Sequence, residues 1–180
     1  MQTEKWTSPE LFETKNRIYT FLNPVSYLIA LENKSLFEQF DGIFADGSLL
    51  VSAIRLVYGK RVTRRSFDMT SLAPELLNYL MESRKTLYIV ASGQEQVECS
   101  VRIFQEQYPK LRIAGFRNGY FSSDAEMNKE ASHIVELNPD FLIVGMGALM
   151  QEKFLLKVKK MGYQGNRLYV WWLCSPNGNE

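Results

Sequence analysis

The sequence has few of the residues that redox chemistry and metal binding depend on. Its two cysteines, Cys99 and Cys174, are far apart and lack metal-site spacing, which is typical of buried thiols in a reducing cytosol. Its one histidine, His133, has no partner pattern for nucleophilic catalysis. The 21 basic and 20 acidic residues nearly balance, so the overall field that favours bulk nucleic-acid binding is missing. We therefore expect no metal site, no nucleic-acid partner and a cytoplasmic location.

Long apolar runs are also absent. The longest, Leu87–Ala91 and Phe141–Leu149, fall well short of the roughly 18 to 20 residues that cross a bilayer. Residues 1–13 are polar and acidic, so we expect no secretory signal. A basic cluster on one predicted helix indicates either peripheral contact with anionic lipid or a solvated helix face. The cluster consists of Lys153, Lys157, Lys159 and Lys160.

The chain does contain a regular alternation of apolar runs and amphipathic segments, without a linker or repeat, and we expect one domain over residues 1–180. The predicted strands are Arg17–Leu22, Asp41–Ala45, Thr86–Ser92, Leu111–Phe116 and Asp140–Gly145. The predicted helices are Leu49–Tyr58, Leu72–Glu82, Gln94–Gln107 and Met150–Lys160, with another opening at a capping box, Ser123–Glu126. This order predicts an α/β, Rossmann-like fold, with a mostly parallel sheet, helices on both faces and ligand sites at the carboxyl ends of strands.

Glycine and polar residues gather at three of these strand ends. The motifs are Phe44-Ala45-Asp46-Gly47-Ser48, Asn118-Gly119-Tyr120-Phe121 and Gly145-Met146-Gly147-Ala148-Leu149-Met150-Gln151-Glu152-Lys153. In this order and spacing they resemble the WecG/TagA/CpsF family of bacterial glycosyltransferases, over roughly Ile18 to Gly165. Each motif alone is a common pattern, but the three together in one short chain are specific.

The resemblance implies an inverting glycosyltransferase that needs no metal and no cofactor. It implies a UDP-sugar donor, with N-acetylmannosamine or its uronic acid as the expected hexose. The implied acceptor is a lipid-diphosphate-linked sugar, used in capsule, exopolysaccharide or other cell-envelope polysaccharide biosynthesis. The enzyme would then work in the cytoplasm, at the inner face of the cell membrane.

Asp46 is the expected catalytic base. It follows an apolar run, and Gly47-Ser48 allows a sharp turn into the next helix, which directs the carboxylate toward a cleft. A carboxylate there can remove the proton of an acceptor hydroxyl as that hydroxyl attacks the anomeric carbon, and the resemblance assigns this role to Asp46. The alternative is that Asp46 caps the following helix, a position that aspartate favours.

The departing nucleotide diphosphate needs positive charge, and the sequence offers Lys60-Arg61-Val62-Thr63-Arg64-Arg65. The family carries an arginine here ahead of a short loop and an aspartate, which corresponds to Asp68, and the resemblance implies that Asp68 contacts the substrate. Counting residues forward from Asp46 without a gap aligns Arg64 with the family arginine, as a catalytic residue. Counting residues back from Asp68 aligns Arg65 with it instead. The alternative is an exposed basic run with no ligand.

The remaining expected contacts position sugar and nucleotide. By resemblance these are Gly145, Gly147, Gln151 and Glu152 at the last junction, Gly119 and Tyr120 at the middle motif, Gly47 and Ser48 beside the base, and Asn23 after the first strand. Gly93 is a further glycine at a strand end and either approaches the nucleotide or only joins strand to helix. Leu149-Met150 replaces the family's proline and lysine, and Phe21 stands where the family has a threonine. A dinucleotide site is disfavoured because Met150 occupies the place of the third glycine.

The end of the sequence departs from the family pattern. After Arg167 the chain reads through Trp171-Trp172 where the family has a strand that ends in glycines. Because tryptophan has a single codon, the doubled tryptophan read one base later encodes Gly-Gly. We therefore expect a truncated or frameshifted family member that lacks the C-terminal end after about residue 167, together with the final strand-turn unit. The competing function is a remnant that binds nucleotide-sugar without turnover, and a generic Rossmann oxidoreductase would require NAD binding.

Overall fold

The computed structural model describes residues 8–169. In that range six strands form one parallel sheet in the order β2-β1-β6-β5-β3-β4. The strands are β1 (Ile18–Leu22), β2 (Gly42–Ala45), β3 (Thr86–Ala91), β4 (Arg112–Arg117), β5 (Phe141–Gly145) and β6 (Asn166–Tyr169). The α/β fold with a parallel sheet is therefore as predicted.

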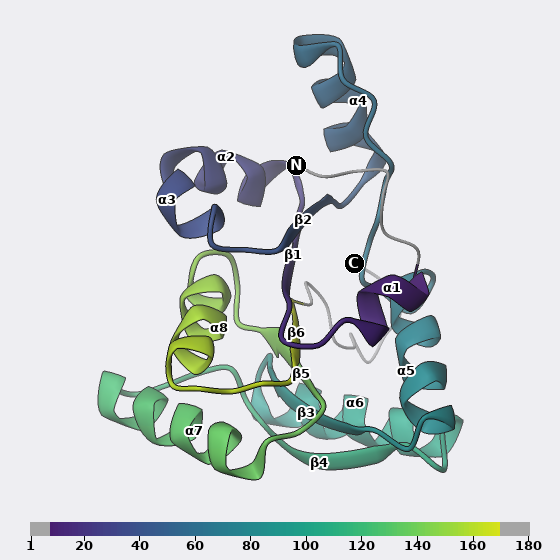
Figure 1. Ribbon diagram of the computed structural model, residues 1–180, viewed down its shortest axis with the longest axis vertical. Coiled ribbons are helices and arrows are strands. Elements are labelled where there is room, and N and C mark those ends of the chain that lie inside the picture. Colours follow the sequence, from purple (N-terminus) through teal and green to yellow (C-terminus); the bar gives the residue numbers. More distant parts are fainter. Residues whose placement is uncertain (1–7, 170–180) are drawn as a thin grey trace.

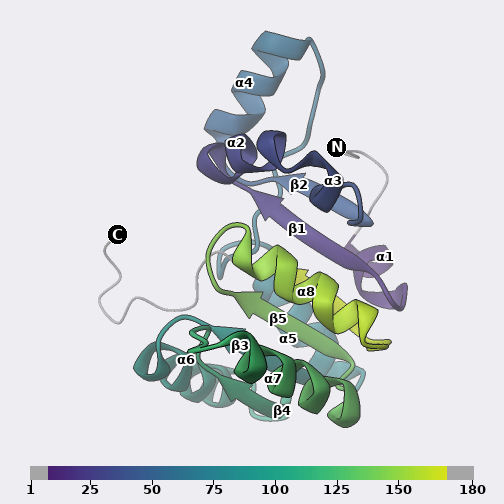
Figure 2. The ribbon, with the colours of Figure 1, turned by 90° about the vertical axis from the view of Figure 1, so that its left-hand side faces the viewer.

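Helices cover both faces of the sheet (Figures 1 and 2). They are α1 (Ser8–Glu13), α2 (Pro24–Glu32), α3 (Lys34–Phe37), α4 (Ser48–Tyr58), α5 (Leu72–Glu82), α6 (Gln94–Gln107), α7 (Asp124–Leu137) and α8 (Met150–Lys160). Figure 1 shows α3, α7 and α8 on one side of the sheet and α1 and α5 on the other. At the end of the sheet formed by β1 and β2, α4 projects away from the rest of the molecule (Figures 1 and 2).

The core has a large part and a small part. β3 and β5 are buried along nearly their whole length because helices pack on both of their faces, and they lie in the large part together with α5, α6, α7 and α8. The small part lies under α2, α3 and α4 and contains six buried residues. They are Leu22, Ala30, Phe37, Ala45, Leu50 and Ile54.

The chain order of the strands creates a crossing point between β3 and β5. From β3 the chain moves outward to β4, and then returns to the other side of β3 to form β5. In open α/β sheets, ligands bind outside the carboxyl ends of strands where the order reverses in this way. The turns after β3 and β5, which contain Gly93 and Gly147, lie at this point.

Candidate active site

Asp46 follows β2 directly, and its backbone N–H donates to the carbonyl oxygen of Leu22 at 2.8 Å. The next residue, Gly47, has φ 94° and ψ 139°, a conformation that glycine adopts readily and other residues do not. Gly47 is also the N-cap of α4, which has no side-chain capping bond. The capping interpretation of Asp46 is therefore wrong for this structure, and its half-buried carboxylate is left for another partner.

That partner is Ser66, whose hydroxyl donates a short hydrogen bond to Oδ1 of Asp46. Ser66 is buried, and the chain reaches it by running beside the end of β2, where the N–H of Arg65 donates to the carbonyl oxygen of Ala45 at 2.9 Å. Oδ2 of Asp46 has no hydrogen-bond partner among residues 8–169. The carboxylate is thus held by one oxygen, while the other can accept a proton. Ser66 was not predicted, because the contact joins residues 20 positions apart and no local pattern marks it.

The two arginines of the basic run have different surroundings. Arg64 is exposed, and its Nη2 lies 4.0 Å from a carboxylate oxygen of Asp68. The guanidinium of Arg65 lies over the ring of Phe44, 5.6 Å from the centroid, and its buried Nη1 has no hydrogen-bond partner in the described part of the chain. An unsatisfied charged donor is costly, whereas an anion placed beside it would form a strong hydrogen bond. Together with Ser66 and Ser71, both arginines line a cavity of about 260 Å³.

Asp68 and Asn23 are engaged in local structure. Asp68 accepts hydrogen bonds from Thr70 and from the hydroxyl of Ser71 ahead of α5. Burial by itself would raise the pKa of Asp68, but these hydrogen bonds outweigh it and lower the pKa. The Asn23 side chain accepts from the N–H of Ser26 at 2.9 Å and caps α2. Their sequence positions thus have a structural explanation, and their expected sugar contacts stay predictions.

Hydrogen bonds join the turns that follow β3, β4 and β5. The N–H of Ser92 donates to the carbonyl oxygen of Gly145 at 2.9 Å, and the N–H of Gly119 donates to the carbonyl oxygen of Ser92 at 2.8 Å. A Cβ on Gly119 would lie 3.0 Å from Cγ of Met146 and 3.3 Å from the carbonyl oxygen of Gly145, so this close approach favours glycine. The structure therefore brings together Gly93, Gly119, Gly145 and Gly147, as the sequence predicts for strand ends of one parallel sheet.

Arg117 holds the turn that carries Tyr120. Its guanidinium lies 4.0 Å from the centroid of Phe121, donates to the carbonyl oxygen of Tyr120 at 2.8 Å and pairs with Glu126 at 3.0 Å. Hydrogen bonds from Ser122, and then the contact with Arg117, lower the pKa of Glu126 to about 2. The Tyr120 side chain itself is exposed at the rim of the turn.

The polar pair at the start of α8 is fully buried. Glu152 accepts from the Thr20 hydroxyl at 2.9 Å and from the N–H of Leu149 at 2.7 Å. Burial raises the pKa of Glu152, although hydrogen bonds from Gln151 and Thr20 oppose the rise. Oε1 of Gln151 is buried and has no hydrogen-bond partner within residues 8–169. Leu149, the residue before the helix, has φ 73°, which is strained for a leucine and is retained by its bond to Glu152.

The expected site residues thus form two groups. One lies at the ends of β1 and β2 and contains Asp46, Arg64 and Arg65, and the other lies at the ends of β3, β4 and β5. β1 and β6 separate β2 from β5 in the sheet, so the two groups stand about three strand spacings, roughly 14 Å, apart. The hydrogen bond between Thr20 of β1 and Glu152 of α8 links them, and it places Gln151 between the groups.

Three lysines of the predicted basic cluster on α8, Lys153, Lys157 and Lys160, line one shallow hollow, and the fourth, Lys159, faces elsewhere. Lys159 lies 3.7 Å from Asp41, which precedes β2, and Lys157 donates to Asn128 of α7 at 2.6 Å. These lysines occupy the last turn of α8, at the amino edge of the sheet and away from Asp46. The geometry favours the solvated-face interpretation of this cluster.

Among residues 8–169, no three or more His, Cys, Asp or Glu side chains are grouped so that they could hold a metal ion. His133 packs edge-on against Tyr88, with ring centroids 6.0 Å apart. Within the same range, no helix is both long enough and apolar enough to span a bilayer.

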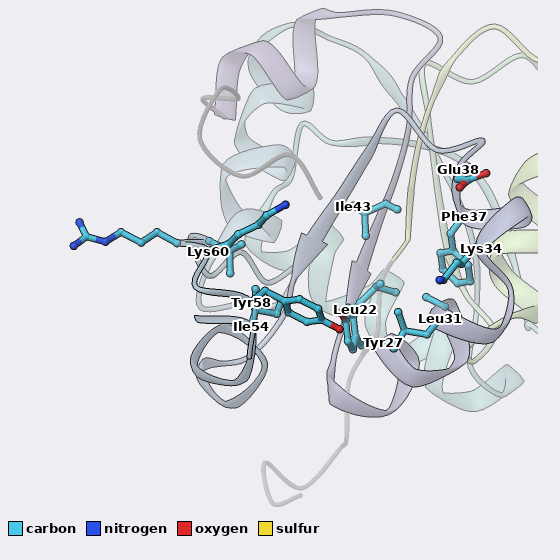
Figure 3. A pocket seen from close by; sticks show the side chains of 13 residues that line it. Leu22, Tyr27, Leu31, Lys34, Phe37, Glu38, Ile43, Ile54, Tyr58 and Lys60 are labelled. Carbon is cyan, nitrogen blue, oxygen red and sulfur yellow. The ribbon is translucent and has the colours of Figure 1, made fainter. Parts of the chain in front are cut away.

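A cavity of about 720 Å³ was not expected from the sequence. It is a groove between α4 on one side and α2 and α3 on the other, with β1 and β2 as its floor (Figure 3). Its walls are mostly apolar, and Lys34, Lys60 and Arg61 also line it. Leu22, which accepts the backbone hydrogen bond of Asp46, is one of its floor residues.

Residues 3–166 match the family model described as glycosyl transferase WecG/TagA/CpsF family. A Shigella boydii protein named UDP-Gal:alpha-D-GlcNAc-diphosphoundecaprenol beta-1,4-galactosyltransferase is 31% identical over 142 residues, which cover 79% of this chain and 59% of that protein. Two proteins named N-acetylglucosaminyldiphosphoundecaprenol N-acetyl-beta-D-mannosaminyltransferase are each 25% identical. The one from Bacillus subtilis is matched over 77% of this chain and 53% of its own length, and the one from Staphylococcus aureus over 79% and 56%. The chain therefore spans little more than half the length of these curated relatives.

Proposed function

The chain belongs to the WecG/TagA/CpsF glycosyl transferase family, and on that premise we propose that it transfers a hexose from a UDP-sugar to a lipid-diphosphate-linked sugar, with inversion, in cell-envelope polysaccharide synthesis. The observation that carries the proposal is the carboxylate of Asp46, which Ser66 holds through one oxygen, together with Arg65, the residue before Ser66, whose buried Nη1 has no hydrogen-bond partner among residues 8–169. A base and a cation for the leaving diphosphate are the two groups that this reaction requires.

In the proposed reaction an acceptor hydroxyl oxygen attacks the anomeric carbon of the donor. The proton of that hydroxyl moves to Oδ2 of Asp46, and the bond between the anomeric carbon and the diphosphate oxygen breaks. The bonding electrons leave with UDP, whose negative charge is balanced by Arg65, with Arg64 as the outer cation. No metal takes part in this scheme.

The turns after β3, β4 and β5 are proposed to hold the nucleotide and sugar, with Gly93, Gly119, Tyr120 and Gly147 nearest to them. The unpartnered Oε1 of Gln151 supports a role in accepting a hydrogen bond from a donor hydroxyl. Since Gln151 is fully buried, this contact requires the side chains over it to move.

The identity of the hexose is a choice between two donors. Resemblance favours N-acetylmannosamine or its uronic acid, and two of the relatives carry N-acetylmannosamine in their names. The relative with 31% identity carries galactose instead. Presenting UDP-N-acetylmannosamine and UDP-galactose separately, with an N-acetylglucosaminyl-diphosphate lipid as acceptor, decides between them.

UDP release tests the proposed function. Release that depends on both the donor and the acceptor supports transfer. Binding of UDP in a calorimetric titration without any release supports the non-catalytic alternative, and failure to bind UDP contradicts both. Binding of NAD instead would support an oxidoreductase.

A further inference from the structure

The helix α4 has more apolar surface than the protein buries. Leu50, Ile54 and Val57 lie at i, i+4 and i+7, and the first two of them face the small core. A second apolar stripe, Leu49, Ala53 and Leu56, runs beside it and is exposed. Leu56 is the extreme case, with 87% of its surface exposed. A helix that is apolar on most of its circumference is normally buried, so this exposure indicates a surface that meets something else.

The helix α2 borders the same groove and has the same property. Its run Pro24–Leu31 contains no charged residue, and only Ser26 and Ala30 of the helix are buried. The groove between the helices is closed at one point by the hydroxyls of Tyr27 and Tyr58, which hydrogen-bond and raise the pKa of Tyr27 (Figure 3). The exposed apolar side chains of the two helices, each more than half exposed, are Val25, Leu28, Leu49, Leu56, Val57 and Tyr58. We call these six the α2–α4 face.

The charge beside this face is of one sign along α4 and the segment that follows it. Residues 48–65 contain five basic residues and no acidic one, in a chain whose net charge is only +1. The five are Arg55, Lys60, Arg61, Arg64 and Arg65. On the other wall of the groove Lys34 is accompanied by Glu38 (Figure 3). Exposed apolar side chains bordered by Lys and Arg are the pattern of helices that lie in the interface of an anionic bilayer.

We propose that the α2–α4 face docks on an anionic lipid bilayer, with the apolar side chains of α2 and α4 inserted among the lipids and Arg55, Lys60 and Arg61 against their phosphates. A second copy of the chain fits the face less well. In a two-fold dimer each patch meets itself, which would set the like charges of residues 55–65 close to one another.

The proposal rests on the proposed function, assigns a docking surface to the membrane contact that this function requires, and places the membrane beside the catalytic carboxylate. α2 begins directly after Asn23, and α4 begins two residues after Asp46. A bilayer held by these helices would present lipid-linked diphosphates to the end of the sheet where Asp46 and Arg65 lie. In this arrangement the acceptor reaches Asp46 from the membrane, and the donor reaches the turns after β3, β4 and β5 from solution.

Flotation with lipid vesicles tests the docking surface without any sugar donor. The full chain should bind vesicles of phosphatidylglycerol and phosphatidylcholine and bind poorly to phosphatidylcholine alone. Leu56→Glu should lower partitioning by about tenfold or more, because an exposed apolar anchor is replaced by a charge that anionic lipid repels. The matched control is Leu137→Glu at the end of α7, which is exposed and remote from the face. Lys60→Glu should also weaken binding, whereas Lys110→Glu before β4 should not.

Two results would overturn the proposal. One is equal vesicle binding by the parent chain and Leu56→Glu, or no binding by either. The other result concerns self-association. Light scattering would show that the parent chain is a dimer and that Leu56→Glu is a monomer, while both bind vesicles equally. The α2–α4 face would then be a self-association surface. UDP titration of Leu56→Glu keeps the two proposals separate. Intact UDP affinity with lost vesicle binding supports docking, and vesicle binding without UDP affinity would contradict only the proposed function.

Discussion

The helices α8 and α4 are both eleven residues long, yet the protein buries six residues of α8 and two of α4. α8 belongs to the β3–β5 end of the sheet, where helices pack on both faces and the turns are joined by backbone hydrogen bonds. α4 belongs to the β1–β2 end, where a six-residue core supports three helices beside an open groove. The first end is a well-packed scaffold, and its turns are the proposed site for the nucleotide and sugar. The second carries Asp46 and has apolar surface left over for a partner.

The largest expected effect is that of replacing Asp46, the proposed catalytic base at the β1–β2 end. Asp46→Asn should lower turnover by about two to four orders of magnitude, the scale for losing a general base, while UDP still binds. Steady-state UDP release measures it. Ser66→Ala sharpens the test, because it removes the hydrogen bond to Asp46 but leaves the carboxylate, and should therefore cost less than Asp46→Asn. Near-normal turnover in Asp46→Asn would remove Asp46 from the mechanism.

The second effect compares the two cores directly. Ile143→Ala in β5 should lower the free energy of unfolding by about 3 to 5 kcal/mol, because its site is enclosed and a cavity remains. Ile54→Ala in α4 should cost only about 1 to 2 kcal/mol, because this residue borders an open groove that can close around the smaller side chain. Urea unfolding of both variants measures the difference. Equal costs would mean that the β1–β2 end is packed as firmly as the scaffold.

The third effect separates the two arginines. Arg65→Ala should weaken UDP binding by about 1.5 to 3 kcal/mol, because it removes a partly buried donor that has no other partner. Arg64→Ala should cost less than about 1 kcal/mol, since Arg64 is exposed and lies near Asp68. Calorimetric titration of UDP ranks them, and the reverse order would move the diphosphate to the outer arginine.

The smallest effect concerns the link between the two ends. Because the folded protein raises the pKa of Glu152 above its usual value of 4.5, the fold favours the neutral carboxyl, and the resulting stabilisation is lost as pH rises through the folded pKa. Glu152→Gln should cost about 1 kcal/mol at low pH, where one acceptor is replaced by a donor. Because glutamine does not titrate, Glu152→Gln should also make the unfolding free energy fall less steeply with rising pH than it does in the parent chain. Glu106→Gln, on the exposed face of α6, serves as the control, and an unchanged pH slope in Glu152→Gln would contradict a raised pKa of Glu152.

The sequence predicted the scaffold better than the open end. The bounds of α5, α6 and α8 match the prediction to the residue, because their apolar stripes face a core. α2 was missed because Pro24–Leu31 is apolar on every side and has no stripe, although Asn23 and Pro24 are a usual helix start. The strand β6 was expected to be lost, but Asn166–Tyr169 pairs with β1 and β5 in the middle of the sheet. The rest of the expected truncation or frameshift falls on residues 170–180, outside the described residues.

The site was predicted at the level of strand ends and not of contacts. Glycine motifs identify where Asp46, Gly119 and Gly145 stand, because parallel strands end at a common edge. The order of the strands decides how far apart they are, and no local pattern encodes that β1 and β6 lie between β2 and β5. The same holds for Ser66 and for the bond from Thr20 to Glu152, which join residues distant in the sequence. The difference between Arg64 and Arg65 likewise depends on burial, which counting along the motif cannot supply.

The most direct test of the proposed transfer is the product itself. The chain is mixed with a UDP-hexose and an N-acetylglucosaminyl-diphosphate lipid in anionic vesicles, and the lipid product is examined by mass spectrometry and proton NMR. The account predicts a lipid heavier by one hexose, with an anomeric configuration opposite to that of the donor and with formation abolished in Asp46→Asn. A product that retains the donor's configuration, or donor that binds and is only hydrolysed to free sugar, would contradict it.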